Sequence, residues 1–138
     1  MKYILWIIAF VIVGYLFTIF ETKRKQKKIE NTFKGRELLS PEAFYEKFYR
    51  DKDIAIETVK GVRKVLEEQL DCDLSQLSSE DDFSENLSFF WDFDSMASVE
   101  IVMALEEEFS VKIEDSEAEK AHTINDIIML VSSKVKNA

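Results

Sequence analysis

Hydrophobic residues are distributed along this chain in two different ways. Residues 3–20 form an unbroken apolar run without a single charged side chain. After residue 40, apolar residues instead recur every three or four positions, with charged residues between them. That spacing is typical of amphipathic helices that bury one face. The pattern therefore predicts one apolar helix followed by an all-α domain.

The apolar run is long enough to cross a membrane. Eighteen helical residues extend about 27 Å, close to the thickness of a bilayer's hydrocarbon core. Only Lys2 precedes the run, whereas five basic residues follow it: Lys23, Arg24, Lys25, Lys27 and Lys28. Since basic residues stay on the cytoplasmic side, we expect a single-pass anchor in the cytoplasmic membrane, with the C-terminal domain in the cytoplasm. A cleaved signal peptide and a buried helix are the alternatives, but no small-residue cleavage site follows the run.

Two helices are expected in the next part of the chain. Ser40 followed by Pro41 and Glu42 is a helix-start signal, because serine caps the helix and proline suits its first position. This short helix is expected to pack on the following domain. The next helix, over 53–70, has a clear apolar side made of Ile54, Val59, Val62, Val65, Leu66 and Leu70. Gly61 weakens that helix by about 1 kcal/mol relative to alanine, unless close packing requires it.

The second half of the chain predicts a long loop and two main helices. Residues 71–83 are expected to form the loop, anchored by Leu74, Leu77 and Phe83. A helix over 95–109 follows, and a final helix begins after Thr123, which is a good N-cap. The expected buried stripe of the helix over 95–109 consists of Met96, Val99, Val102, Leu105 and Phe109.

An aromatic segment precedes the helix over 95–109. Phe89, Phe90, Trp91 and Phe93 place four aromatic residues within five positions. Loop aromatics that close over a small core are one interpretation, and an exposed recognition patch is the other. Ser116 to Ala121 is expected to form one short helical turn between the two main helices.

Composition excludes several classes of function. The net charge of -9 argues against nucleic-acid binding, because phosphates would be repelled. A single cysteine, Cys72, and a single histidine, His122, leave no disulfide framework, no CxxC motif, no histidine metal cluster and no catalytic triad. Residues 71–82 have the ligand spacing of a calcium-binding loop, but Gln76 stands where that loop needs glycine. We therefore expect no metal, with a calcium-responsive membrane adaptor kept as a minor hypothesis.

Two stretches resemble the acyl carrier proteins. These are DSMASVEIVMALEEEF and the VKIEDSEAEKAHTINDI that follows it closely. Acyl carrier proteins are small four-helix bundles that carry acyl chains on a phosphopantetheine arm, and the resemblance covers about residues 53–135. It implies an all-α, acyl-carrier-like four-helix bundle over 53–138. The membrane anchor over 1–22 and a short helical linker over 23–52 would precede that bundle.

The resemblance also implies which residues act. The family's Asp-Ser-Leu motif corresponds to Asp94, Ser95 and Met96, so Ser95 would carry the 4'-phosphopantetheine arm. A phosphopantetheinyl transferase would attach it, and acyltransferases or synthases with basic patches would dock on Asp94, Met96, Glu100, Met103, Glu106 and Glu107. The charge bias supports docking independently, since residues 80–119 hold 14 acidic residues and one basic residue, Lys112.

This chain departs from the family's usual pattern in two ways. The family usually has glycine three residues before the serine, where this chain has Asp92. The loop before Ser95 is also about four residues longer than usual, and its aromatic residues occupy the extra length. The leading hypothesis is a membrane-tethered acyl carrier, not an enzyme, serving membrane-associated lipid or polyketide-type synthesis. The alternative is a carrier-fold interaction module at the membrane that never takes the arm.

Overall fold

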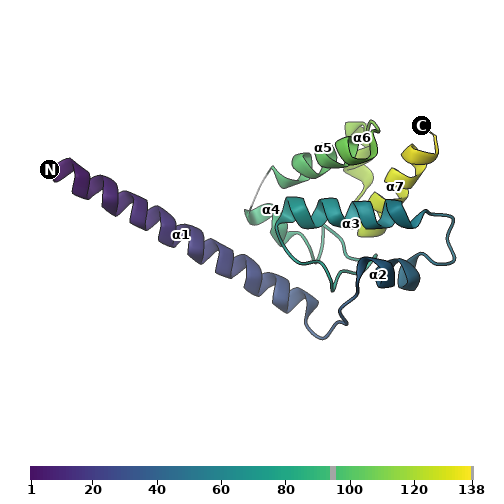
Figure 1. The fold of residues 1–138 in the computed structure, drawn as a ribbon, viewed down its shortest axis with the longest axis horizontal. Helices are drawn as coiled ribbons and strands as arrows, with labels where there is room; N and C mark the ends of the chain where they lie inside the picture. The colour runs from purple at the N-terminus through teal and green to yellow at the C-terminus, as the bar shows by residue number, and fades with distance from the viewer. Residues whose placement is uncertain (94–95, 138) are drawn as a thin grey trace. The chain divides into compact units, whose positions relative to one another are not determined.

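The computed structural model describes residues 1–93 and 96–137, and in this part of the chain the structure is helical (Figure 1). Its helices are α1 (Lys2–Phe33), α2 (Pro41–Phe48), α3 (Ile56–Leu70), α4 (Phe89–Phe93), α5 (Ala97–Phe109), α6 (Asp115–Lys120) and α7 (Ile124–Lys136). Among the described residues the only strand-like pairing is an isolated bridge between Asp82 and Thr123. The all-α fold predicted from the sequence is confirmed.

The chain divides into two compact units, Met1–Thr32 and Phe33–Ala138. The first unit is nearly all of α1, whose apolar side chains are exposed along residues 3–17. Helix α1 is long enough and apolar enough to cross a membrane. The second unit contains the other six described helices. The division at residues 22 and 52 stays a prediction, because the compact units are defined by packing and not by membrane boundaries.

Helix α3 is the centre of the second unit. It packs against α5, α2 and α7, and Figure 1 shows it between α2 and α5. The expected apolar side is confirmed, because all six residues that the sequence placed on it are buried: Ile54, Val59, Val62, Val65, Leu66 and Leu70. Leu74, Leu77 and Phe83 are buried as expected and complete the core below it.

Gly61 lets α3 approach α5 closely. A Cβ atom at this position would lie 2.6 Å from Cζ of the Phe109 ring, well inside contact distance. The close packing that the sequence left open is therefore present. It explains a glycine in the middle of a helix, where alanine would otherwise be preferred.

We expect Gly61→Ala to destabilise the protein by about 1 kcal/mol. Overpacking costs about 1–3 kcal/mol, which outweighs the gain of about 1 kcal/mol in helix propensity. In a Phe109→Ala background the same substitution should instead stabilise by about 1 kcal/mol, because the ring is gone. Urea unfolding of the four variants measures both effects. Equal stabilisation in both backgrounds would show that the ring does not constrain position 61.

Residues 33–54 belong to the second unit and are not a loose linker. Ser40 caps α2 as predicted, its Oγ accepting a hydrogen bond from the Ala43 N–H at 3.1 Å. Phe44 is 1 % exposed and Tyr49 is fully buried, and the Tyr49 hydroxyl lies 2.9 Å from Oδ1 of Asn125. Helix α2 thus packs on the carrier-like helices, as the sequence predicted.

A partly buried ion pair joins this segment to the loop after α3. Arg36 Nη1 lies 2.8 Å from Oδ2 of Asp81, whose residue is only 2 % exposed. The hydrogen bond to Asp81 raises the pKa of the Arg36 guanidinium. Asp81 also accepts hydrogen bonds from Asn86 Nδ2 and from the Ser78 N–H, both at 2.8 Å. The stability of the folded chain depends on all three donors to the buried Asp81 carboxylate, because an unpaired buried charge is costly.

The loop after α3 is also attached to the start of α7. The N–H groups of Ile124 and Asn125 donate to carbonyl oxygens of Asp81 and Ser79, at 2.9 and 2.8 Å. Thr123 caps α7 as predicted, its Oγ1 accepting from the Asp126 N–H at 2.9 Å. Burial raises the pKa of the Asp126 carboxyl, but hydrogen bonds from the N–H groups of Thr123 and His122 outweigh it, and the net shift is downward.

Two expectations about local structure were wrong. Residues 89–93 form the short helix α4 instead of a loop, because Phe89 and Phe90 are buried and one helical turn lets both face the core. In α5 the buried line is Ala97, Ile101 and Leu105, whereas Met96 and Val99 are about half exposed. Of the expected stripe, Leu105 is buried as predicted and the Phe109 ring packs against Gly61 of α3.

Candidate functional site

The predicted attachment motif lies at the start of α5. Asp94 and Ser95 are outside the described residues, so the structure describes the motif only from Met96 onward. Met96 is the N-cap residue of α5, and no described side chain caps this end of the helix. The first turn of a 13-residue helix therefore offers its backbone N–H groups and its positive dipole end to an anion.

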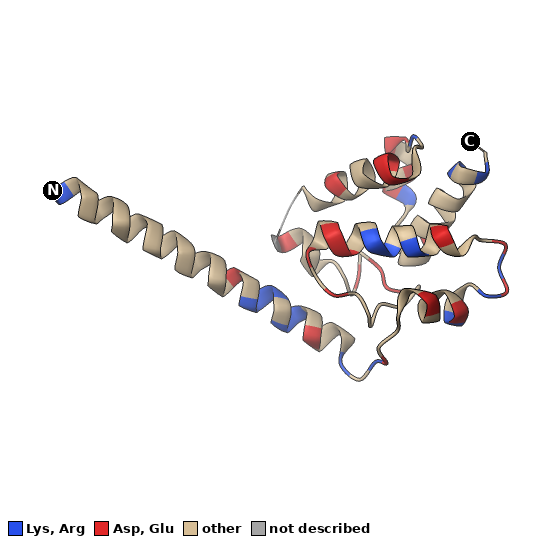
Figure 2. Cartoon of the chain, in the orientation of Figure 1, with Lys and Arg blue, Asp and Glu red and all other residues tan. Residues whose placement is uncertain are grey.

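The outer face of α5 combines acidic and apolar residues. Met96 and Met103 are 54 % and 62 % exposed, and the side chains of Glu100 and Glu107 are exposed as well. Acidic residues continue onto α6, as Figure 2 shows. Half-exposed methionines beside carboxylates form a surface that is adaptable in shape and negative in charge.

Glu106 differs from the other predicted docking residues. It is half-buried, and its Oε2 accepts a hydrogen bond from the Ile113 N–H at 3.0 Å. The side chain therefore holds the link between α5 and α6 in place. No pattern in the sequence indicates this contact, because Ile113 is seven positions away along a link without helical periodicity.

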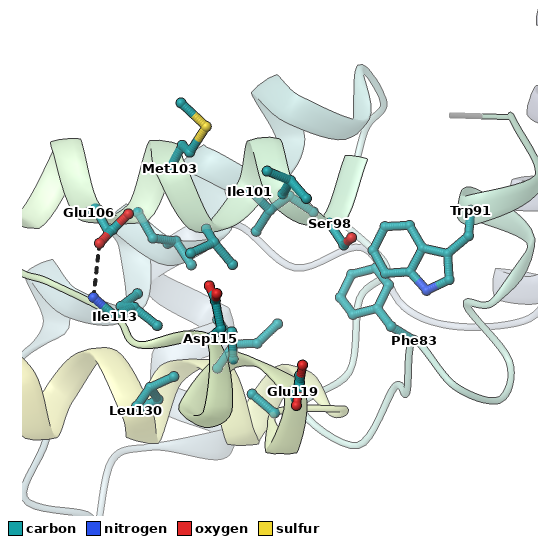
Figure 3. Close-up of a pocket in the computed structure, with 16 residues that line it drawn as sticks. Phe83, Trp91, Ser98, Ile101, Met103, Glu106, Ile113, Asp115, Glu119 and Leu130 are labelled. Atoms are coloured by element: carbon teal, nitrogen blue, oxygen red, sulfur yellow. Dashed lines mark hydrogen bonds between the residues drawn. The ribbon is translucent and has the colours of Figure 1, made fainter. Parts of the chain in front are cut away.

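An open, mainly apolar cavity of about 540 Å³ lies beside α5 (Figure 3). Helix α5 forms one wall from its first turn to its middle, and α6, α7 and the link between α5 and α6 form the opposite wall. Its apolar lining includes Ile101, Val102, Leu105, Ile113, Ile127 and Leu130, and polar atoms come from Ser98, Glu106, Asp115 and Glu119. The cavity can take a narrow apolar group.

The aromatic segment contributes to both the core and the cavity. Phe89 and Phe90 are buried and stack with ring centroids 4.4 Å apart. Trp91 is half-buried, stacks on Phe83 at 4.9 Å, and lines the cavity together with it. The closing role expected for these aromatics is confirmed for Phe89 and Phe90. The sequence showed Trp91 only as one of four clustered aromatic residues, and its contribution to a cavity could not be predicted from that clustering.

Carboxylates of the loop over 71–82 form hydrogen bonds within turns. No group of three or more His, Cys, Asp or Glu side chains able to hold a metal occurs among the described residues. The carboxylates have other partners: Asp73 accepts from the Ser75 N–H at 2.9 Å, and Asp82 accepts from the Ser84 hydroxyl at 2.6 Å. Hydrogen bonds from the Ser84 hydroxyl and from the Ser84 N–H lower the pKa of the Asp82 carboxyl. Turn formation accounts for the acidic residues that suggested calcium.

Comparison with known proteins identifies the region that contains this site. A family model described as the phosphopantetheine attachment site matches residues 60–131. An acyl carrier protein of Thermosynechococcus vestitus is 40 % identical over 79 residues, covering 57 % of this chain and 93 % of that protein. An acyl carrier protein of Helicobacter hepaticus is 40 % identical over 78 residues, covering 56 % of this chain and 97 % of that protein. The matched region contains α5, the cavity and the predicted motif.

Proposed function

Because the chain belongs to the acyl carrier protein family, we propose that it carries acyl groups as thioesters on a 4'-phosphopantetheine arm esterified to Ser95, at the cytoplasmic face of a membrane. Proteins of this family are carriers and not catalysts. Membership of the family implies the arm. The proposal that the arm carries acyl groups is supported by the apolar cavity that runs along α5 from its first turn.

The residues around the start of α5 fit such an arm. The phosphodiester of the arm is an anion, and the first turn of α5, where the described residues show no side-chain cap, supplies backbone N–H donors and the positive end of the helix dipole. Ser98, in that turn, is exposed and lies on the cavity, so the surface is open where the arm would pass. When bound, the arm supplies the thiol that holds an acyl group as a thioester.

The cavity would shelter the acyl group between partner enzymes. Its walls remove apolar surface from water, which stabilises a buried chain by about 25 cal/mol per Å². The carboxylates of Glu106, Asp115 and Glu119 at its edge disfavour acyl groups that carry a negative charge of their own. The cavity therefore suits a neutral, largely apolar acyl group.

Partner enzymes would dock on the outer face of α5. We assign this surface to Asp94, Met96, Glu100, Met103 and Glu107, with Glu106 contributing mainly by holding Ile113. Basic patches on a phosphopantetheinyl transferase, acyltransferases and synthases complement its charge and accelerate association at low salt. Exposed methionines adapt to several partners, which suits a carrier that visits more than one enzyme.

The arm can be tested in the cell by Ser95→Ala. We expect complete loss of the protein's function in its host, because no other residue would hold the thiol. Ser88→Ala is the matched control, since Ser88 is exposed and seven residues away. Growth or product analysis of a strain carrying each variant measures the effect. Normal function of Ser95→Ala would favour the alternative, an interaction module that never takes the arm.

We further propose that α1 anchors the carrier in the cytoplasmic membrane. The apolar side chains of residues 3–17 are exposed along the helix, and in water so large an apolar surface would aggregate. Five basic residues follow the run, which favours a cytoplasmic C-terminal domain. Tethering would raise the local concentration of the carrier near membrane-bound enzymes of lipid or polyketide-type synthesis.

Membrane attachment predicts a specific fractionation behaviour. The full chain should sediment with membranes, resist extraction by high salt and carbonate, and be released by detergent. A variant that lacks residues 1–22 should be found in the soluble fraction, because the basic residues alone bind weakly and are displaced by salt. A mature protein that begins after residue 20 in the host would contradict the anchor and indicate a cleaved signal.

A further inference from the structure

The cavity has two chemically different ends. Figure 3 shows the rings of Phe83 and Trp91 at the end near Ser98, while Ile113 and Leu130 lie toward the other end. The first end is aromatic, with Glu119 near it, and the second is aliphatic apart from Glu106, whose carboxylate accepts a hydrogen bond from the Ile113 N–H. Ser98 is in the first turn of α5, three residues after the proposed attachment residue. The aromatic end is therefore the end closer in sequence to the arm.

The aromatic wall is held in place by the backbone on both sides. The Phe83 N–H donates to the His122 carbonyl at 2.8 Å, within the bridge that joins the loop to the start of α7. The Trp91 N–H donates to the Ser88 carbonyl at 3.1 Å, in the turn that leads into α4. The two rings stack at 4.9 Å with planes 25° apart. The backbone bonds hold the main chain, and the stacking restrains the two rings against each other, so the aromatic surface is partly preorganised for a flat ligand.

We propose that Trp91 is a specificity-determining residue that favours acyl groups with a flat, conjugated segment next to the thioester, followed by an aliphatic tail. This inference rests on the proposed function. A trans-2-enoyl thioester is planar from its carbonyl to its third carbon and can stack on an aromatic ring. A saturated chain lacks such a face and makes only ordinary apolar contact. The aliphatic end of the cavity accepts the tail in both cases.

The matched pair of octanoyl and trans-2-octenoyl groups tests this directly. The full chain is loaded in detergent with each acyl-phosphopantetheine arm, using a phosphopantetheinyl transferase. The rate at which hydroxylamine cleaves each thioester is measured by intact-mass spectrometry. This rate is then divided by the rate for the same acyl group on free pantetheine. The ratio gives the protection that the protein provides and removes the intrinsic reactivity difference between the two thioesters.

We expect the octenoyl group to be protected about threefold to tenfold more than the octanoyl group, from the usual strength of aromatic contacts. Trp91→Leu should remove the difference while keeping an apolar wall, and Trp91→Phe should keep most of it. Equal protection in the native chain, or an unchanged difference in Trp91→Leu, would overturn the inference and leave the carrier function intact. A chain that takes no arm at all would overturn both.

Discussion

Removal of residues 1–52 is expected to take away most of the stability of the carrier domain, whereas removal of residues 1–32 is expected to leave it folded. The reason is the burial in the segment between the two truncation points. Four large side chains there are nearly inaccessible to water: Phe33, Leu39, Phe44 and Tyr49. Each contributes about 1.5–3 kcal/mol, and small domains have only about 5–15 kcal/mol in total.

The shorter chain would also lose polar partners. Asp81 would stay buried without Arg36, and Asn125 would lose the Tyr49 hydroxyl. Arg63 is 5 % exposed and lies against the Phe44 ring, 5.9 Å from its centroid, so that face of α3 would open to water. Because the Arg36 side chain is 34 % exposed, losing this ion pair should cost less than the roughly 3–5 kcal/mol of a fully buried pair. That cost adds to the loss of apolar contacts.

Thermal unfolding followed by circular dichroism compares the two truncated chains. The chain that begins at residue 33 should melt cooperatively, and the chain that begins at residue 53 should melt at least 15 °C lower or without a clear transition, by the usual relation of free energy to melting temperature. Phe44→Ala in the longer chain should cost about 3–5 kcal/mol, whereas Leu38→Ala should cost little, since Leu38 is 73 % exposed. Equal melting temperatures of the two chains would instead support the domain boundary predicted at residue 53.

This expectation gives residues 33–52 a role that the family alone does not imply. The family model begins at residue 60, so the segment is outside the matched region. In this chain the segment covers α3 and holds the loop that carries Phe83, which in turn forms part of the cavity wall. The added segment and the site are therefore linked by packing.

Local signals in the sequence predicted much of the fold. The caps at Ser40 and Thr123, the apolar side of α3 and the buried anchors of the following loop were all found from residue type and spacing. These features depend on neighbours within a few residues, which periodicity reads well. At Gly61 the sequence left two possibilities, a weakened helix or a close contact, and only the structure identifies the contact with Phe109.

The features that the sequence did not reveal depend on distant residues. Arg36 and Asp81 are 45 positions apart, and no pattern identifies such a pair. The buried line of α5 was misjudged because apolar residues occur on both its inner and outer faces, so Met96 and Val99 fit a helical stripe without being buried. The aromatic run was too short to show a period, and its division between core and cavity depends on packing with Phe83.

Loss of the arm proposed on Ser95 has the largest expected effect on function, because without the arm's thiol the chain cannot hold an acyl group. Attachment of the arm also depends on the least typical part of the chain. By the resemblance noted in the sequence, Asp92 stands where glycine is expected, and the aromatic segment, which includes α4, lengthens the connection that a transferase would approach. A transferase from the same host would be adapted to this loop, and its docking would use the acidic face of α5.

Intact-mass measurement of the full chain, co-expressed with the phosphopantetheinyl transferase of its own host, tests this most directly. The chain should gain the mass of one phosphopantetheine arm, with fragmentation placing the added mass on Ser95. Ser88→Ala, which alters an exposed serine outside the predicted motif, should still gain it, and Ser95→Ala should not. A chain that stays at its unmodified mass, or carries the arm on another residue, would contradict the central claim.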